Sequence, residues 1–437
     1  MTRTSILLGA ALLGASLHLP LAEPALAMTY VMMGDGDLAD RSETIVQGRV
    51  ETIREARGRA ALNHRVSVEV AVKGQAVPGE RLTVRLPGNP RRTRGLSLKL
   101  WGVPELAAGE RVLLFLNRNE DGTYRALHLG LGMFKVASSA EGERAVRSLG
   151  DAHEMAGGRS RATREERYGI RDIQRFEGWL ADRARGVVRP ADYFVENGDA
   201  VATDSSAGAL NAAGSAGARI YWGKLRWFDF EAAQGDRTVR FFSDPLGQPG
   251  VPGLGHKDFA AALRAWTNHL GSTIFYGYAG KTNAEGGLDE FDGINAILFQ
   301  RRLADAFDCE AGGLLAMGGP WFEEHGKKKF RDKRYYPIVG ADIVVNDGIE
   351  CYFEESPDAR KAAEELFAHE LGHTLGLGHS CGDRESGACD ETDEDEALMR
   401  AFVHDDARGA RIGVHDKAAI CELYPDVNLS SEECARR

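Results

Sequence analysis

Short alternating apolar runs dominate the first third of the chain, from about Ser42 to Val136. Turn-forming pairs such as Pro78-Gly79 and Asp121-Gly122 separate them. Alternation with a period of two predicts half-buried β-strands, and closely spaced turns favour a small barrel or sandwich. The runs span residues 44–46, 66–70, 82–86 and 112–116. We therefore expect residues 28–139 to form a small all-β accessory domain.

Other patterns follow this region. Apolar residues at helical spacing within residues 160–186 predict one amphipathic helix. Residues 200–218 are mostly Ala, Gly, Ser, Thr and Asn, a composition that buries too little apolar surface to order itself. Residues 140–218 are therefore predicted to be a charged helix followed by a flexible linker. Strand-like and helix-like segments then alternate through residues 219–437, which predicts an α+β or α/β domain.

The first 27 residues have the pattern of a secretory signal peptide. Arg3 precedes an apolar run from Ile6 to Leu19, and the small residues Ala25 and Ala27 follow. A membrane anchor is the alternative, but this run is shorter than the roughly 20 residues needed to cross a bilayer. No later stretch of the sequence could span a membrane. We therefore expect a secreted, extracellular protein.

Composition and charge exclude several classes of protein. The 437 residues are 43% hydrophobic and 27% charged, which is typical of folded globular chains. Residues 219–437 contain 39 acidic and 25 basic side chains, a net charge of −14, whereas the preceding residues carry +3. A nucleic-acid platform would need a basic surface. We therefore expect no nucleic-acid partner. No pattern in the sequence distinguishes a monomer from an oligomer.

The strongest local signal is the run from His369 to His379, HELGHTLGLGH. A helix is predicted from Pro357 to about Leu375, with Ser356 as its N-cap, so that His369 and His373 lie one turn apart on one face. Gly376 can adopt the left-handed conformation that ends a helix and lets the chain reverse. His379 then arrives as a third metal ligand.

These residue types suit metal-assisted hydrolysis. Three neutral imidazoles bind Zn²⁺ and leave its fourth position open to water. Glu370, beside the histidines, is a candidate general base that accepts a proton from this water and then passes it to the leaving amine. A closed structural zinc site is the alternative, but such a site fills all four positions and needs no adjacent carboxylate.

This run resembles the metzincin zinc peptidases, and within them the matrixin-like secreted proteases. Ser380 directly follows the third histidine, and Ala397-Leu398-Met399 resembles the Met-turn of that family. The resemblance covers roughly residues 220–425. It implies one catalytic zinc ion and support of the metal site by Met399. It also implies a fold in which a twisted sheet and an active-site helix form the peptidase domain.

Further upstream, Gly312-Gly313-Leu314-Leu315-Ala316 resembles the strand that borders the active-site cleft in the same family. An exposed strand edge binds extended peptide through its backbone groups. The resemblance therefore implies that Leu314, Leu315 and Ala316 bind substrate. The family's frequent second zinc site has no clear counterpart in this chain. No cysteine precedes Cys309, so latency would need another ligand or steric cover.

The six cysteines all lie in the last third of the chain, and export permits disulfides. Preference for short loops predicts three pairs, 381 with 389, 309 with 351, and 421 with 434. An acidic run at residues 390–396 offers oxygen ligands for Ca²⁺, although a solvated surface loop is the favoured interpretation.

Together these patterns predict a secreted zinc-dependent endopeptidase that acts on proteins or peptides. The alternative is a secreted binding or adhesion protein that acts through its N-terminal β domain, with the metal module latent or serving as a scaffold. For either function, residues 28–218 are a retained accessory domain or a removable pro-region.

Overall fold

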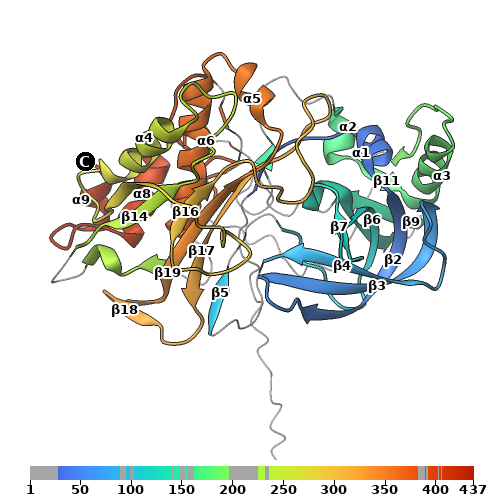
Figure 1. Ribbon diagram of the computed structural model, residues 1–437, viewed down its shortest axis with the longest axis horizontal. Coiled ribbons are helices and arrows are strands. Elements are labelled where there is room, and N and C mark those ends of the chain that lie inside the picture. Colours follow the sequence, from blue (N-terminus) through green and yellow to red (C-terminus); the bar gives the residue numbers. More distant parts are fainter. Residues whose placement is uncertain are drawn as a thin grey trace, which may run out of the picture.

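The protein is described by a computed structural model. It describes residues 28–88, 95–98, 100, 103–139, 142–147, 153–154, 162–195, 225–231, 236–381, 389, 392–401, 403–404 and 406–437. The predicted signal peptide and the predicted Ala/Gly/Ser linker lie outside these residues. Two sheets organise the described chain, one on each side of the molecule in Figure 1.

A closed five-stranded barrel forms the first body. Its strands pair in the cyclic order β2, β3, β4, β7, β6 and back to β2, and apolar side chains on their inner faces fill the interior. Four further strands extend the sheet from β6, in the order β8, β9, β11 and β12. The strands are β2 (Thr44–Glu55), β3 (Ala61–Lys73), β4 (Arg81–Pro87), β6 (Arg111–Arg118), β7 (Tyr124–Ala126), β8 (Met133–Ser139), β9 (Gly142–Arg147), β11 (Ile170–Asp172) and β12 (Phe194–Val195).

Three helices accompany this barrel: α1 (Asp35–Arg41), α2 (Arg164–Tyr168) and α3 (Ile173–Ala184). The predicted amphipathic helix is thus divided, because Ile170 lies in β11 and only the segment after Asp172 is the long helix α3. Asp172 caps α3 by accepting a hydrogen bond from the backbone N–H of Arg175. Phe176 and Leu180 of α3 are buried, as their spacing predicts.

The second body is a ten-stranded mixed sheet with the main order β10-β1-β17-β19-β16-β14-β15. Strands β14, β15, β16 and β19 are parallel, whereas β17 is antiparallel to both β1 and β19. Its strands are β1 (Thr29–Val31), β5 (Leu96–Leu98), β10 (His153–Glu154), β13 (Leu225–Trp227), β14 (Val239–Ser243), β15 (Tyr276–Lys281), β16 (Asn295–Leu298), β17 (Gly313–Glu323), β18 (Lys328–Phe330) and β19 (Lys333–Val345). Three of them, β1, β5 and β10, come from the first 154 residues.

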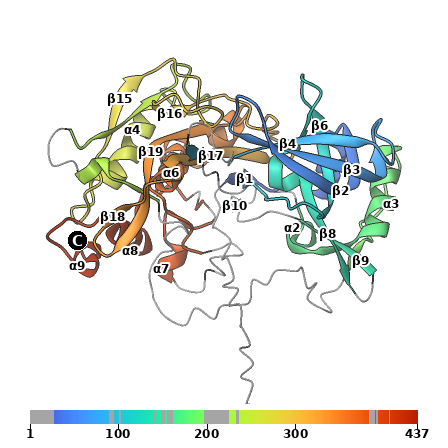
Figure 2. The same cartoon turned by 90° about the horizontal axis from the view of Figure 1, so that it is seen from below.

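Helices pack against this sheet on the side that carries the candidate site (Figures 1 and 2). The indole N–H of Trp266 in α4 donates to the Ala368 carbonyl of α6 at 2.9 Å and ties the two longest helices of this body together. The helices are α4 (His256–Thr267), α5 (Glu350–Glu354), α6 (Ala359–Thr374), α7 (Thr392–Asp395), α8 (Val414–Leu423) and α9 (Ser431–Ala435), with short 3₁₀ turns at Leu129–Gly132 and Asp229–Glu231. Within the described residues, we find no helix with the length and apolar character needed to cross a bilayer.

The predicted fold class is wrong. We expected a metzincin-like α+β or α/β peptidase domain, with a twisted sheet and an active-site helix, preceded by a small all-β domain. The structure instead has a closed five-stranded barrel, mixed sheets and only 24% helix, which does not fit a matrixin-like fold. The physical reason is that periodicity locates a strand without identifying its pairing partner, which for β1 and β5 lies hundreds of residues away on β17.

The two bodies share a hydrophobic core. One cluster of buried side chains combines Met28 and Leu98 with Leu314, Met317 and residues of the barrel interior. This cluster therefore joins residues from both ends of the chain. The ten-stranded sheet is likewise completed by β1, β5 and β10 from the N-terminal part.

The six cysteines form three disulfides, Cys309–Cys351, Cys381–Cys389 and Cys421–Cys434. This pairing confirms the predicted connectivity. Three disulfides are compatible with an extracellular protein.

The shared sheet and core predict that residues 219–437 do not fold by themselves. Without β1 and β5, strand β17 keeps β19 as a partner but loses the two strands on its other edge. Apolar side chains such as Met317 are then exposed. We expect this fragment to aggregate when produced alone and to become soluble when residues 28–195 are produced with it as a separate chain. Size-exclusion chromatography and circular dichroism measure both outcomes. A soluble fragment that unfolds cooperatively would contradict the shared-core interpretation.

Candidate metal centre

Helix α6 positions the first residues of the site. Its N-cap is Asp358, whose carboxylate accepts hydrogen bonds from the backbone N–H groups of Arg360 and Lys361. The helix therefore begins slightly later than predicted, at Ala359, and ends at Thr374. Its second half is buried on all sides between α4 and β17, which fixes the direction of its side chains.

Gly376 ends α6 and reverses the chain. Its φ of +88° lies in the left-handed region, and its backbone N–H bonds to the His373 carbonyl at 2.9 Å. A Cβ at this position would lie 2.9 Å from the Leu225 carbonyl oxygen, so a larger residue has neither the conformation nor the space. The reversal brings His379 back to the helix, as the sequence predicts.

The structure brings His369, His373 and His379 together in a buried group. Their ligand nitrogens all lie within 4.8 Å of one another. The Nε2 atoms of His369 and His373 are 3.0 Å apart. Two nitrogens bound at 2.0 to 2.1 Å to a tetrahedral metal ion are separated by about 3.3 Å, so this spacing fits a shared ion.

Main-chain carbonyl groups fix the tautomers of two rings. The Nδ1 atom of His369 lies 2.9 Å from the Leu398 carbonyl oxygen, and Nδ1 of His373 lies 2.9 Å from that of Leu377. A carbonyl oxygen only accepts, so each Nδ1 carries the proton and donates. In the neutral rings, both Nε2 atoms then present lone pairs to each other, which is repulsive unless a cation lies between them. This donor arrangement fits a bound metal ion.

Burial keeps these rings neutral. Loss of hydration lowers the pKa of His369 to about 4, and burial together with repulsion from the neighbouring histidines holds the pKa values of His373 and His379 well below their usual range. A neutral imidazole is the form that binds metal ions.

Glu370 lies beside this group and is fully buried. Burial raises the pKa of its carboxyl group to about 7, and hydrogen bonds from the Thr29 hydroxyl and the Gly318 backbone N–H oppose that shift. The Thr29 hydroxyl donates to Oε1 of Glu370 at 2.6 Å, across 341 positions of sequence. A carboxyl group with a pKa near 7 exchanges protons readily at neutral pH.

Met399 packs against α6 at Gly372, the residue before His373. A Cβ at Gly372 would overlap Sδ of Met399, so the absence of a side chain at Gly372 allows this close approach. The neighbouring Leu398 supplies the carbonyl group that orients His369. The turn that contains Leu398 and Met399 therefore supports the histidine group directly.

Asp416 of α8 holds this turn in place, a role that the sequence interpretation missed. Its buried carboxylate accepts hydrogen bonds from the backbone N–H groups of Leu398, Met399 and Gly413 at 2.7, 2.9 and 2.7 Å. Burial raises the pKa of Asp416 while these three donors oppose the rise. The only local signal for this role is an acidic residue in the first turn of α8.

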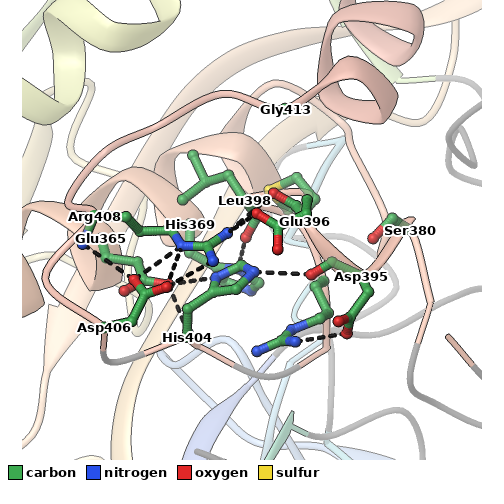
Figure 3. A network of polar contacts seen from close by, with 12 residues as sticks. Glu365, His369, Ser380, Asp395, Glu396, Leu398, His404, Asp406, Arg408 and Gly413 are labelled. Atoms are coloured by element: carbon green, nitrogen blue, oxygen red, sulfur yellow. Dashed lines mark hydrogen bonds and ion pairs between the residues drawn. The ribbon is translucent and has the colours of Figure 1, made fainter. Parts of the chain in front are cut away.

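A second polar network braces the same loop from outside (Figure 3). The His404 ring lies between Oε1 of Glu365, on α6, and the Asp395 carbonyl oxygen, at 2.8 Å from each. Nearby, Arg408 pairs with Asp406 and Glu396. These contacts connect the loop after the third histidine to α6.

Ion pairs with arginine occupy two of the predicted Ca²⁺ ligands. Asp390 and Glu391 lie outside the described residues. The carboxylates of Asp395 and Glu396 pair with Arg400 and Arg408, respectively. Arginine partners already balance these two carboxylates.

The predicted substrate-binding residues lie on β17. Leu314, Leu315 and Ala316 are fully buried in this strand, and β1 of the same chain pairs with it. Thr29 is in register with Ala316, and Tyr30 with Leu314. The edge that was expected to meet substrate is therefore covered by the N-terminal segment in this structure.

A second group of potential metal ligands combines His269, Cys421 and Cys434. The two cysteines are joined in a disulfide, so neither offers a thiolate. The three-histidine group is thus the better candidate for a metal ion.

No protein-family model matches the sequence, and no curated protein matches it at a significant level.

The role of Asp416 predicts a loss of metal affinity in Asp416→Asn. The new amide NH₂ would face backbone N–H donors, so the turn that supplies the Leu398 carbonyl would shift. Loss of a hydrogen bond that orients a metal-binding imidazole lowers metal affinity by about 10- to 100-fold. Competition with a chromophoric chelator for Zn²⁺ measures this, and Glu422→Gln on the same helix is the control. Unchanged affinity in folded Asp416→Asn would contradict the positioning role.

Proposed function

We propose that this protein is a zinc-dependent endopeptidase that hydrolyses peptide bonds in proteins. The observation that carries the proposal is the buried group of three histidines with Glu370 directly beside it. Three neutral imidazoles are a common ligand set of catalytic zinc and leave one coordination position for water or substrate. A carboxylate in this place has no use in a closed structural site.

His369, His373 and His379 would hold the ion. When bound, zinc supplies Lewis-acid chemistry that activates a water molecule and polarises the substrate carbonyl group. Glu370 accepts the proton of the attacking water and then donates it to the leaving amine nitrogen, so its carboxyl group ends the cycle as it began.

The other residues position these groups. The Leu398 and Leu377 carbonyl groups orient two imidazoles, and Met399 supports the helix that carries them. The sequence from His369 to His379 and the turn at Met399 resemble the metzincin peptidases, which supports the same chemistry. The proposal uses this local motif and not a shared fold.

The predicted signal peptide and the three disulfides support secretion as part of the proposal. Extracellular proteins or peptides are then the substrates. An extended peptide is the form of substrate that suits a site bordered by a strand such as β17.

Glu370→Gln tests the proposal most directly. The substitution keeps the shape of the side chain but removes the proton acceptor, so cleavage of an unfolded protein should fall by about 10²- to 10⁴-fold while zinc content stays near one per chain. Glu364→Gln, on the same helix, is the matched control and should leave cleavage unchanged. Undiminished, chelator-sensitive cleavage by Glu370→Gln would contradict the role of Glu370.

A further inference from the structure

The N-terminal strand β1 lies where an extended substrate would pair with the sheet. It runs antiparallel to β17, with Thr29 opposite Ala316, Tyr30 opposite Leu314 and Val31 opposite Gly313. Figure 2 shows β1 beside β17 at the centre of the molecule, between the two bodies. The backbone edge of β17 is therefore already paired with a strand of the same chain.

The first residue of this strand also covers the proposed general base. The Thr29 hydroxyl donates to Oε1 of Glu370 at 2.6 Å, and both side chains are fully buried. This hydrogen bond occupies one of the two carboxylate oxygen atoms with which Glu370 could accept a proton from water. The Thr29 hydroxyl is not an electrophile, unlike the carbonyl group of a scissile peptide bond. The side chain next to Glu370 is therefore not itself a substrate.

A barrel residue covers the same strand from the other body. The backbone N–H of Leu314 donates to Nδ1 of His128 at 3.2 Å, and His128 is buried with a φ of +45° in the left-handed region. Such a conformation is costly for a residue with a side chain and persists only where its surroundings enforce it. The interface between barrel and sheet thus holds His128 against β17.

The segment that follows β1 anchors it in the barrel body. Met32 and Met33 are buried in the same apolar cluster as Phe134 and Phe176. Asp35 comes next, and its buried carboxylate pairs with two guanidinium groups, those of Arg147 and Arg171. Removing one partner from such a buried network is strongly destabilising. The barrel therefore keeps β1 in place by contacts outside the candidate site.

We propose that residues 28–31 are a built-in inhibitor of the site, in which β1 takes the place of substrate backbone along β17 and Thr29 caps Glu370. This inference rests on the proposed function and assigns a regulatory role to the barrel. We therefore expect the chain that begins at Met28 to cleave slowly. It opens when the residues before Tyr30 are removed or β1 is displaced from β17.

The test compares zinc-loaded chains that differ only at this strand. One chain begins at Met28, and a second begins at Tyr30, which removes the cap on Glu370 but keeps the anchoring residues Met32 and Met33. Two further variants retain the full strand: Thr29→Val has the same shape without the hydroxyl, and Thr29→Ser keeps a hydroxyl. Zinc content and thermal unfolding are measured for each.

The main readout is binding of a fluorescent peptidyl hydroxamate, which needs both the metal and an open edge, and cleavage of an unfolded protein is followed in parallel. We expect the chain that begins at Tyr30 to bind the probe at least tenfold more tightly than the chain that begins at Met28. Thr29→Val should fall between them because a hydrogen bond to a charged group is worth on the order of tenfold or more in equilibrium. Thr29→Ser should behave like the parent chain.

The remaining outcomes distinguish the proposed inhibitory role of β1 from the proposed endopeptidase function. Equal probe binding by all zinc-loaded chains, or binding by none, would overturn the inhibitor. Tighter probe binding by the shortened chain without cleavage by any chain would support the inhibitor and contradict the endopeptidase. Failure of every chain to hold zinc would contradict the proposed function and with it the site that the strand is proposed to block. If the shortened chain unfolds, the comparison of Thr29→Val with Thr29→Ser still decides.

Discussion

The hydrogen bonds from two imidazole Nδ1 atoms to main-chain carbonyl oxygens are the interactions on which the site depends. They fix the tautomers of His369 and His373, so that both Nε2 lone pairs point into the same small volume 3.0 Å apart. These two lone pairs repel each other. Protonation of one ring would relieve the repulsion, but burial lowers the pKa values of both rings and so disfavours the protonated form. A cation bound between the two rings would relieve the repulsion, which makes this group a candidate metal site.

The wider structure serves this arrangement. The carbonyl groups belong to Leu377, placed by the helix end at Gly376, and to Leu398, placed by Asp416 from α8. The helix that carries the rings packs on β17, and β17 is completed on one side by β1 from the other end of the chain. The same sheet therefore carries the histidine helix and the strand that covers Glu370. This common framework explains how the barrel can influence a site to which it contributes no metal ligand.

Local features of the site could be predicted from the sequence, whereas long-range ones could not. The histidine group, the helix end at Gly376 and two of the disulfides depend on residues close together in sequence, and spacing rules describe them well. The contact between Thr29 and Glu370 joins residues 341 positions apart, and the contact between His128 and Leu314 joins residues 186 positions apart. No periodicity encodes such partners. For the same reason, the sequence suggested a small all-β domain followed by a metzincin-like domain, whereas the chain builds a closed barrel and a mixed sheet with strands from both of its ends.

X-ray absorption at the zinc edge of the zinc-loaded chain that begins at Met28 shows whether the three histidines hold the ion. We expect one ion per chain, with three imidazole nitrogen ligands at about 2.0 to 2.1 Å and no sulfur ligand. Loss of this signal in His373→Ala, with the chain still folded, would assign the ligands to the three-histidine group. A sulfur shell at about 2.3 Å, or no bound ion, would rule out the three-histidine zinc site.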